Sequence, residues 1–185
     1  ITAENYSWMR EWSGGHCWRM LTHREILRDI RFDPALLYGE DTLFFVMEFL
    51  KAGSLAFLNC PLYAYLERPD SAVRQKPSLR FYTAALAWER VWQLVKGQPE
   101  PFRSTTDQRC IMSCAEVYFR LVNQPERDPE KEKTLLELAS THRHAAWKIP
   151  SEHKSQKLQA LMMGYCPHLG AKVWKLVRWV KGLKN

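Results

Sequence analysis

The spacing of apolar residues predicts a helix within residues 38–53, YGEDTLFFVMEFLKAG. Apolar side chains recur at positions 43, 44, 46, 47 and 50, the register of a wide buried helix face, and Gly53 suits its C-terminal end. Glu40 and Asp41 precede this face, where acids meet the positive end of the helix dipole and where Asp is a favoured N-cap. On these residues alone, Asp41 is interpreted as a helix cap.

Short segments on both sides of this helix have a different pattern. HCWRML at residues 16–21 and LYAYLER at residues 62–68 have the bulky, alternating character of strands, and SLAFLN at residues 54–59 is a compact apolar segment. THREILRDI at residues 22–30 predicts a short helix opened by Thr22. Together these segments predict a small sheet with one or two helices packed against it.

From about Pro77 onward, helical periods alternate with Pro and Gly breakers. The expected helices span residues 78–97, 107–124, 128–148 and 151–164, followed by a helical tail. Pro129 suits the first position of its helix, and the early Glu residues there suit the helix dipole. We therefore expect an α/β fold class that is mostly α, with a sheet-containing unit at residues 1–76 and a helical extension at residues 77–185.

The positive charge is concentrated in the tail, residues 165–185. The tail carries +5 of the chain's net charge of +7 and contains no acid, which leaves +2 for the residues before it. On a helical wheel an apolar arc is flanked by Trp174 and Trp179, and most basic residues fill the remainder; the arc consists of Leu169, Val173, Leu176, Val177, Val180 and Leu183. This layout is typical of an interfacial helix on anionic lipid, and the alternative is a C-terminal helix packed on the domain with a solvated basic face.

The cysteines indicate reduced thiols in a cytosolic setting. The chain has five, an odd number that is widely spread and contains no CxxC pair. Cys110 and Cys114 share a helix face, and we interpret them as core thiols in preference to metal ligands. His142 and His144 are the only close His pair and lie among charges, so no metal site is predicted in this chain.

An ordered set of residues between positions 15 and 75 carries a more specific signal. The set consists of Trp18, Arg24, Arg31, Phe32, Glu40, Asp41, Leu62, Tyr63, Tyr65, Arg68 and Ser71. A tryptophan-containing strand, a short basic helix, "rF" followed by "ED", a helix, a strand and "LYxYxxRxxS" occur in this order in one enzyme family. The stretch resembles the C-terminal half of the catalytic domain of family 2, GT-A type glycosyltransferases.

The resemblance implies an inverting sugar transfer with a single carboxylate base. Asp41 is then the base that removes the proton of the acceptor hydroxyl, with Glu40 beside it. Arg68, Ser71 and Arg74 match the loop that closes over the donor diphosphate, because guanidinium groups bind phosphate oxygens through paired N–H donors. The alternative for this loop is a solvated turn.

His16 and Trp18 are the expected acceptor-binding residues. An aromatic face can stack on the C–H face of a sugar, which would make Trp18 part of an acceptor platform, and a buried core Trp is the alternative.

The family's N-terminal half holds the nucleotide-sugar fold and a DxD motif that carries a divalent metal, Mg or Mn. This sequence contains no DxD. We therefore expect a partial GT-A-like domain, a fragment of a longer parent, that binds no metal itself and has negligible transferase activity alone. The parent is expected to use a nucleotide-sugar donor and a polysaccharide or glycolipid acceptor. A sheet that lacks its partner strands leaves an exposed edge, so self-association of the fragment is also expected.

Two hypotheses of function follow. The first is the acceptor-side half of a glycosyltransferase, cytoplasmic and peripheral at the inner face of the membrane. The second is a non-catalytic helical interaction module whose basic tail binds a membrane or an acidic partner. Nucleic-acid binding is not predicted, because aromatics do not interleave with a basic patch outside the tail.

Overall fold

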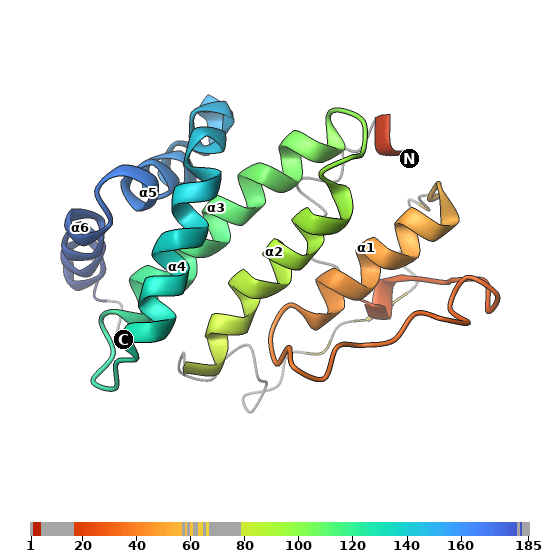
Figure 1. Cartoon of the computed structure of the whole chain (residues 1–185), viewed down its shortest axis with the longest axis horizontal. Helices are drawn as coiled ribbons and strands as arrows, with labels where there is room; N and C mark the ends of the chain where they lie inside the picture. The colour runs from red at the N-terminus through yellow and green to blue at the C-terminus, as the bar shows by residue number, and fades with distance from the viewer. Residues whose placement is uncertain are drawn as a thin grey trace.

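The computed structural model describes residues 2–4, 17–56, 58, 60, 63, 64, 66, 79–180 and 182. Its α-helices are α1 (Glu40–Ala52), α2 (Thr83–Val95), α3 (Phe102–Leu121), α4 (Pro129–His142), α5 (Lys154–Tyr165) and α6 (Pro167–Val180) (Figure 1). Short 3-10 helices add η2 (Cys17–Arg19), η4 (Leu79–Tyr82), η5 (Arg143–Lys148) and η6 (Ser151–His153). Over the ranges that the structure describes, the fold is all-α.

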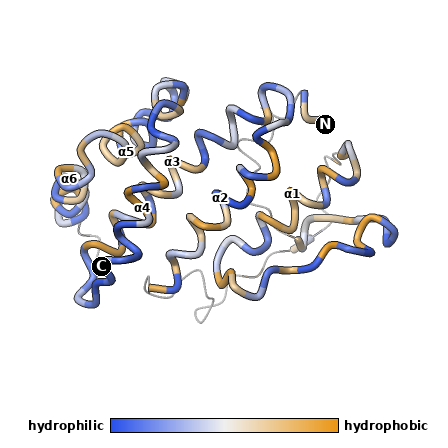
Figure 2. The backbone as a smooth tube through the Cα atoms, in the orientation of Figure 1, coloured by the Kyte–Doolittle hydropathy of each residue, from blue (hydrophilic) through white to orange (hydrophobic). Residues whose placement is uncertain are grey.

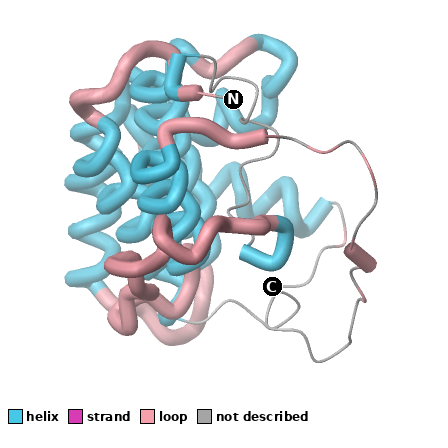
Figure 3. Tube along the Cα trace, turned by 90° about the vertical axis from the view of Figure 1, so that its right-hand side faces the viewer, coloured by secondary structure: helices cyan, strands magenta, loops and turns pink. Residues whose placement is uncertain are grey.

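The expected sheet is wrong, because the described residues contain no strand (Figure 3). Within residues 16–21 the chain forms η2, closed by a hydrogen bond from Met20 N–H to Cys17 C=O at 3.1 Å. A strand needs a neighbouring strand to pair its backbone groups, and without one a local turn satisfies them instead. Alternation of bulky residues therefore did not suffice to make a strand here. The described parts of 54–59 and 62–68 are likewise irregular.

The helix expected at residues 22–30 is also wrong, because this segment forms successive turns. Its backbone bonds join residues three apart, such as Ile26 N–H to His23 C=O at 2.9 Å and Ile30 N–H to Leu27 C=O at 3.2 Å. The expected α1 is confirmed, and its backbone closes at Gly53, whose N–H donates to Phe49 C=O.

The helices expected after Pro77 are confirmed with shifted bounds. Helix α3 begins at Phe102, in the Pro-containing stretch between the helices expected at residues 78–97 and 107–124. Glu100 lies just outside this start, and its Oε2 accepts from Ser104 N–H at 3.0 Å, which satisfies a donor of the first turn. Asp128 caps α4 by accepting from Lys131 N–H, and Pro129 occupies the first turn as expected.

Helix α3 is the central element: α2, α4, α5 and α6 pack against it, and α1 packs on α2. Helices α1, α2 and α3 lie side by side, α4 covers α3, and α5 and α6 complete the far end. Apolar residues form one core cluster around α3 and a second between α1 and α2, and Figure 2 shows apolar and polar stretches alternating along these helices. Because α1 packs on α2, close contacts cross the predicted division between residues 1–76 and 77–185. That division itself stays a prediction.

Gly39 allows the close approach of α1 to α2. Its φ of 83° lies in the left-handed region, and a Cβ there would lie 2.7 Å from Ala87 Cβ. Thr83 Oγ1 accepts from the backbone N–H of Tyr38 at 2.9 Å, which ties the loop before α1 to the first turn of α2. The start of α1 is thus fixed by contacts with α2.

Candidate functional site

Helix α6 is attached to the domain by its small residues. Gly170 and Ala171 are buried, and a Cβ on Gly170 would lie 2.6 Å from Phe119 Cζ of α3. Trp174 is half-buried and packs against the α3-centred core. The side of α6 that faces the domain is therefore defined by Gly170, Ala171 and Trp174.

The larger apolar residues of α6 remain on the surface. Leu176 is 58% exposed and Trp179 is 76% exposed, and the other exposed members are Leu169, Val177 and Val180. Successive helical residues are rotated by about 100°, so Leu169, Leu176 and Val180 share a side that differs from the side of Gly170 and Trp174. We call Leu169, Leu176, Val177, Trp179 and Val180 the α6 apolar face.

Basic side chains lie on the same helix as the α6 apolar face. Lys172 and Lys175 are exposed, and the guanidinium carbon of Arg178 lies 4.7 Å from the centre of the Trp174 ring. The segment from residue 164 to the C-terminal residue contains no acid. The remaining two lysines of the tail, Lys181 and Lys184, and Leu183 lie outside the described residues. Within α6 itself, the exposed surface is thus apolar and positively charged.

The predicted catalytic pair lies in the first turn of α1. The N-cap position is Gly39, so Asp41 is not the cap that its sequence context indicated. The Asp41 carboxylate instead accepts from the Thr42 N–H at 2.8 Å. Glu40 is the first helical residue and is half-buried. The roles of Glu40 and Asp41 as catalytic residues stay predictions.

The structure brings one predicted acceptor residue near this helix start. Trp18 belongs to η2 and stacks on Tyr63, with ring centres 4.6 Å apart and both side chains exposed. Burial raises the pKa of the neighbouring Cys17 to about 11, and the negative charges of Asp41, Glu48 and Glu40 add to this effect. The alternative of Trp18 as a buried core residue is wrong.

The other predicted site residues are His16, Arg68, Ser71 and Arg74, which lie outside the described residues. The structure therefore brings together Glu40, Asp41 and the segment of Trp18, and it gives no placement for the expected diphosphate loop.

A buried polar cluster joins α2, α3 and the end of α4, and sequence reasoning missed it. The His142 side chain is 1% exposed, with Nδ1 2.6 Å from Asp107 Oδ1 and Nε2 2.8 Å from Glu89 Oε2. Burial by itself lowers the pKa of His142, but the hydrogen bonds and charges of Asp107 and Glu89 outweigh it and raise that pKa to about 9. The hydrogen bond from His142 is in turn the main reason why the pKa of Glu89 is lowered. At neutral pH the ring is therefore a cation between two carboxylates.

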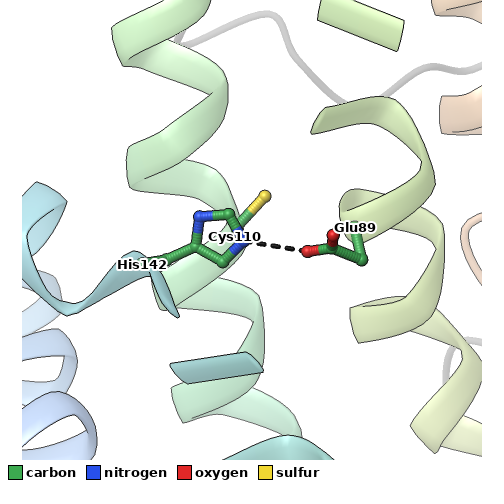
Figure 4. A group of neighbouring side chains, drawn as sticks. All are labelled: Glu89, Cys110 and His142. Carbon is green, nitrogen blue, oxygen red and sulfur yellow. Dashed lines mark hydrogen bonds and ion pairs between the residues drawn. The ribbon is translucent and has the colours of Figure 1, made fainter. Parts of the chain in front are cut away.

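Cys110 lies beside this ion cluster (Figure 4). Its thiol donates to Trp88 C=O at 3.3 Å, and burial raises its pKa well above the ordinary value. The ligand atoms of Glu89, Cys110 and His142 all lie within 4.8 Å of one another. A signal was present in the sequence, because Asp107 and Cys110 are three residues apart on one helix face and His142 follows Leu135 and Ala139 on the buried side of α4.

Comparisons with protein-family models, with curated proteins and with solved structures each found no match. The resemblance to GT-A type glycosyltransferases is accordingly wrong: it required a small sheet, the described residues form none, and no family model supports it. In the described part of the chain, no helix combines the length and hydropathy required to cross a bilayer.

Proposed function

We propose that this chain is a helical module that binds anionic membrane surfaces through α6. The observation that carries the proposal is the orientation of this helix. Its small residues Gly170 and Ala171 occupy the contact with the domain together with Trp174, and the large residues of the α6 apolar face stay exposed. The transferase hypothesis rested on the resemblance to a sheet-containing domain and is not carried further.

The exposed apolar residues suit the boundary between lipid headgroups and acyl chains. Transferring a Val or Leu side chain from water to an apolar environment yields about 1.5–3 kcal/mol when burial is complete. Leu176 and Val180 lie one turn apart, so one shallow insertion buries both. Trp179 adds an aromatic ring of the kind that is enriched at membrane interfaces.

The charge of the segment selects anionic lipid. A basic residue near an anionic leaflet contributes about 1 kcal/mol, and this attraction falls off within a Debye length. Lys172 and Lys175 are exposed on the same helix as the α6 apolar face, and no acid opposes them between residue 164 and the C-terminal residue. The combination of exposed apolar residues and unopposed lysines supports a peripheral attachment, which we propose to be at the inner face of a membrane.

Liposome flotation tests the proposal. We expect the chain to float with vesicles that contain phosphatidylglycerol and to stay at the bottom with pure phosphatidylcholine. The double variant Leu176→Ser/Val180→Ser should lose most of the flotation. Leu158→Ser is the matched control, because Leu158 is an exposed leucine on α5, outside the α6 apolar face.

Charge-reversal variants distinguish the electrostatic attraction to anionic lipid from the insertion of apolar side chains. Lys172→Glu/Lys175→Glu should weaken flotation strongly at low salt, whereas Lys133→Glu on α4 should not. Equal flotation of the Leu176→Ser/Val180→Ser variant and the unaltered chain would refute membrane docking by this face. No flotation of the unaltered chain on anionic vesicles would refute membrane binding altogether and favour an acidic protein partner.

A further inference from the structure

The cluster of Glu89, Cys110 and His142 has the composition of a transition-metal site. It offers one carboxylate oxygen, one sulfur and one imidazole nitrogen, and their ligand atoms lie within 4.8 Å of one another. Each comes from a different helix: Glu89 from α2, Cys110 from α3 and His142 from the end of α4 (Figure 4). We propose that these three residues bind a zinc-like divalent ion at the junction of the three helices.

The surroundings of His142 match those of a metal-binding histidine. Such residues hold the metal through one ring nitrogen and donate the other ring N–H to a carboxylate, which fixes the orientation of the ring. Asp107 Oδ1 lies 2.6 Å from Nδ1, on the opposite side of the ring from Glu89. Trp92 packs perpendicular to the ring and further fixes it, with ring centres 5.5 Å apart and planes 89° apart. Asp107 is thus a positioning residue and leaves Nε2 to the ion.

The spacing needs only a modest adjustment. Zinc binds N, O and S at roughly 2.0–2.3 Å, which separates two tetrahedral ligands by about 3.5 Å. The present Nε2 to Oε2 distance of 2.8 Å is that of a hydrogen bond, so Glu89 must withdraw to admit an ion. Its side chain is 22% exposed, which gives it room to move and gives the ion a route from solvent. A water molecule would complete the coordination.

The exchange conserves charge. On binding, the ion displaces the proton of the Cys110 thiol and the proton on His142 Nε2, and both protons leave to solvent. One dication thereby replaces two protons in the cluster, and the carboxylates of Glu89 and Asp107 stay ionised. The buried junction keeps its net charge, so no new uncompensated charge is created. The thiolate ligand favours zinc or cobalt over magnesium, calcium or manganese, which prefer oxygen donors.

Cobalt(II) absorption tests the site directly. The three cysteines outside the cluster and off α3 are first replaced, giving Cys17→Ser/Cys60→Ser/Cys166→Ser, so that only Cys110 and Cys114 remain. We expect Co²⁺ added to this protein to give a near-ultraviolet thiolate-to-cobalt band and intense visible bands typical of four-coordinate cobalt. Zn²⁺ should bleach these bands. Absence of the thiolate band would overturn the proposal.

Single changes in the same background identify the ligands. Cys110→Ser should abolish the thiolate band. Glu89→Gln should shift the visible bands. Cys114→Ser should keep the full spectrum, because Cys114 is an equally buried thiol on the same helix that is not part of the cluster. Asp107→Asn should weaken Co²⁺ binding by about 10- to 100-fold, as loss of an outer carboxylate typically does.

Folding is followed by far-ultraviolet circular dichroism in EDTA, so that loss of the fold is not mistaken for loss of a ligand. If Cys114→Ser loses the thiolate-to-cobalt band and Cys110→Ser keeps it, the thiolate ligand is Cys114 and the proposed site is refuted. If Cys110→Ser does not fold, the Cys114→Ser spectrum and a Co²⁺ titration of Glu89→Gln still decide the question. Unchanged visible bands in Glu89→Gln would exclude its carboxylate from the site.

Discussion

The His142 cluster and the α6 apolar face depart from the usual distribution of residues in opposite directions. The first places a charged histidine in the interior between two partly buried carboxylates, and the second leaves large apolar side chains in water. A buried ionic group persists only when its partners are in place, so the His142 cluster depends on the packing of α2, α3 and α4. The α6 apolar face makes no such demand, because its residues are exposed in the folded chain and in the unfolded chain alike. Changes in the first should therefore affect stability, and changes in the second should affect binding.

The largest expected effect is that of His142→Ala. It removes the cation and leaves Glu89 and Asp107 facing each other across a cavity, which should lower the free energy of unfolding by about 3–5 kcal/mol. Urea denaturation measures this loss. His144→Ala is the matched control, since His144 is exposed and two residues away. A loss under 1 kcal/mol for His142→Ala would show that the cluster is not a stabilising contact.

Stability should also fall as the pH rises. In the metal-free protein the pKa of His142 is raised from 6.5 to about 9, so the folded state binds its proton more tightly than the unfolded chain. The resulting stabilisation is complete below pH 6.5 and is lost as the pH rises through 9. Its full size is roughly 3 kcal/mol, at 1.36 kcal/mol for each pH unit between 6.5 and about 9. Urea melts in EDTA between pH 6 and pH 10 should show the decline, and His142→Gln should flatten it; a decline of equal size in that variant would assign it to other groups.

Gly170→Ala should lower the stability by a smaller amount. Gly170 is the residue at which α6 contacts Phe119 of α3. The new Cβ would lie 2.6 Å from Phe119 Cζ and 2.9 Å from Cε1, so α6 or the ring must shift. Overpacking of this kind costs about 1–3 kcal/mol. Gly97→Ala is the control, because nothing lies within 4 Å of a Cβ at that position. Equal thermal stability of the two variants would contradict the close contact of α6 with α3.

The smallest effect on stability is expected for Leu176→Ser/Val180→Ser. Both side chains are largely exposed, and substitutions at such surface sites change the free energy of unfolding by about 0.5 kcal/mol or less. Differential scanning calorimetry should therefore show nearly unchanged melting, in contrast to the loss of flotation expected for the same variant. A marked destabilisation would mean that these residues pack on the domain.

The elements predicted from the sequence were most reliable where one helix carried its own signals. The α1 pattern with Gly53, and the Asp128 and Pro129 start of α4, are local, and the structure confirms both. Strands could not be predicted in this way, because a strand is stable only when it pairs with a second strand. The local sequence pattern does not show whether such a second strand is present. The start of α3 was missed for a related reason: Glu100 lies between Pro99 and Pro101, and its carboxylate accepts from Ser104 N–H in the first turn of the helix.

The sequence by itself determined that α6 is amphipathic, basic and free of acids, because periodicity and charge are properties of the residues alone. Only the tertiary structure decided which side of α6 meets the domain, since that choice depends on Phe119 of a distant helix accepting a glycine and no larger residue. The His142 cluster shows the same division. Its members are separated by 18 residues or more between helices, at positions 89, 107, 110 and 142, and only the packing of α2, α3 and α4 brings their side chains within bonding distance.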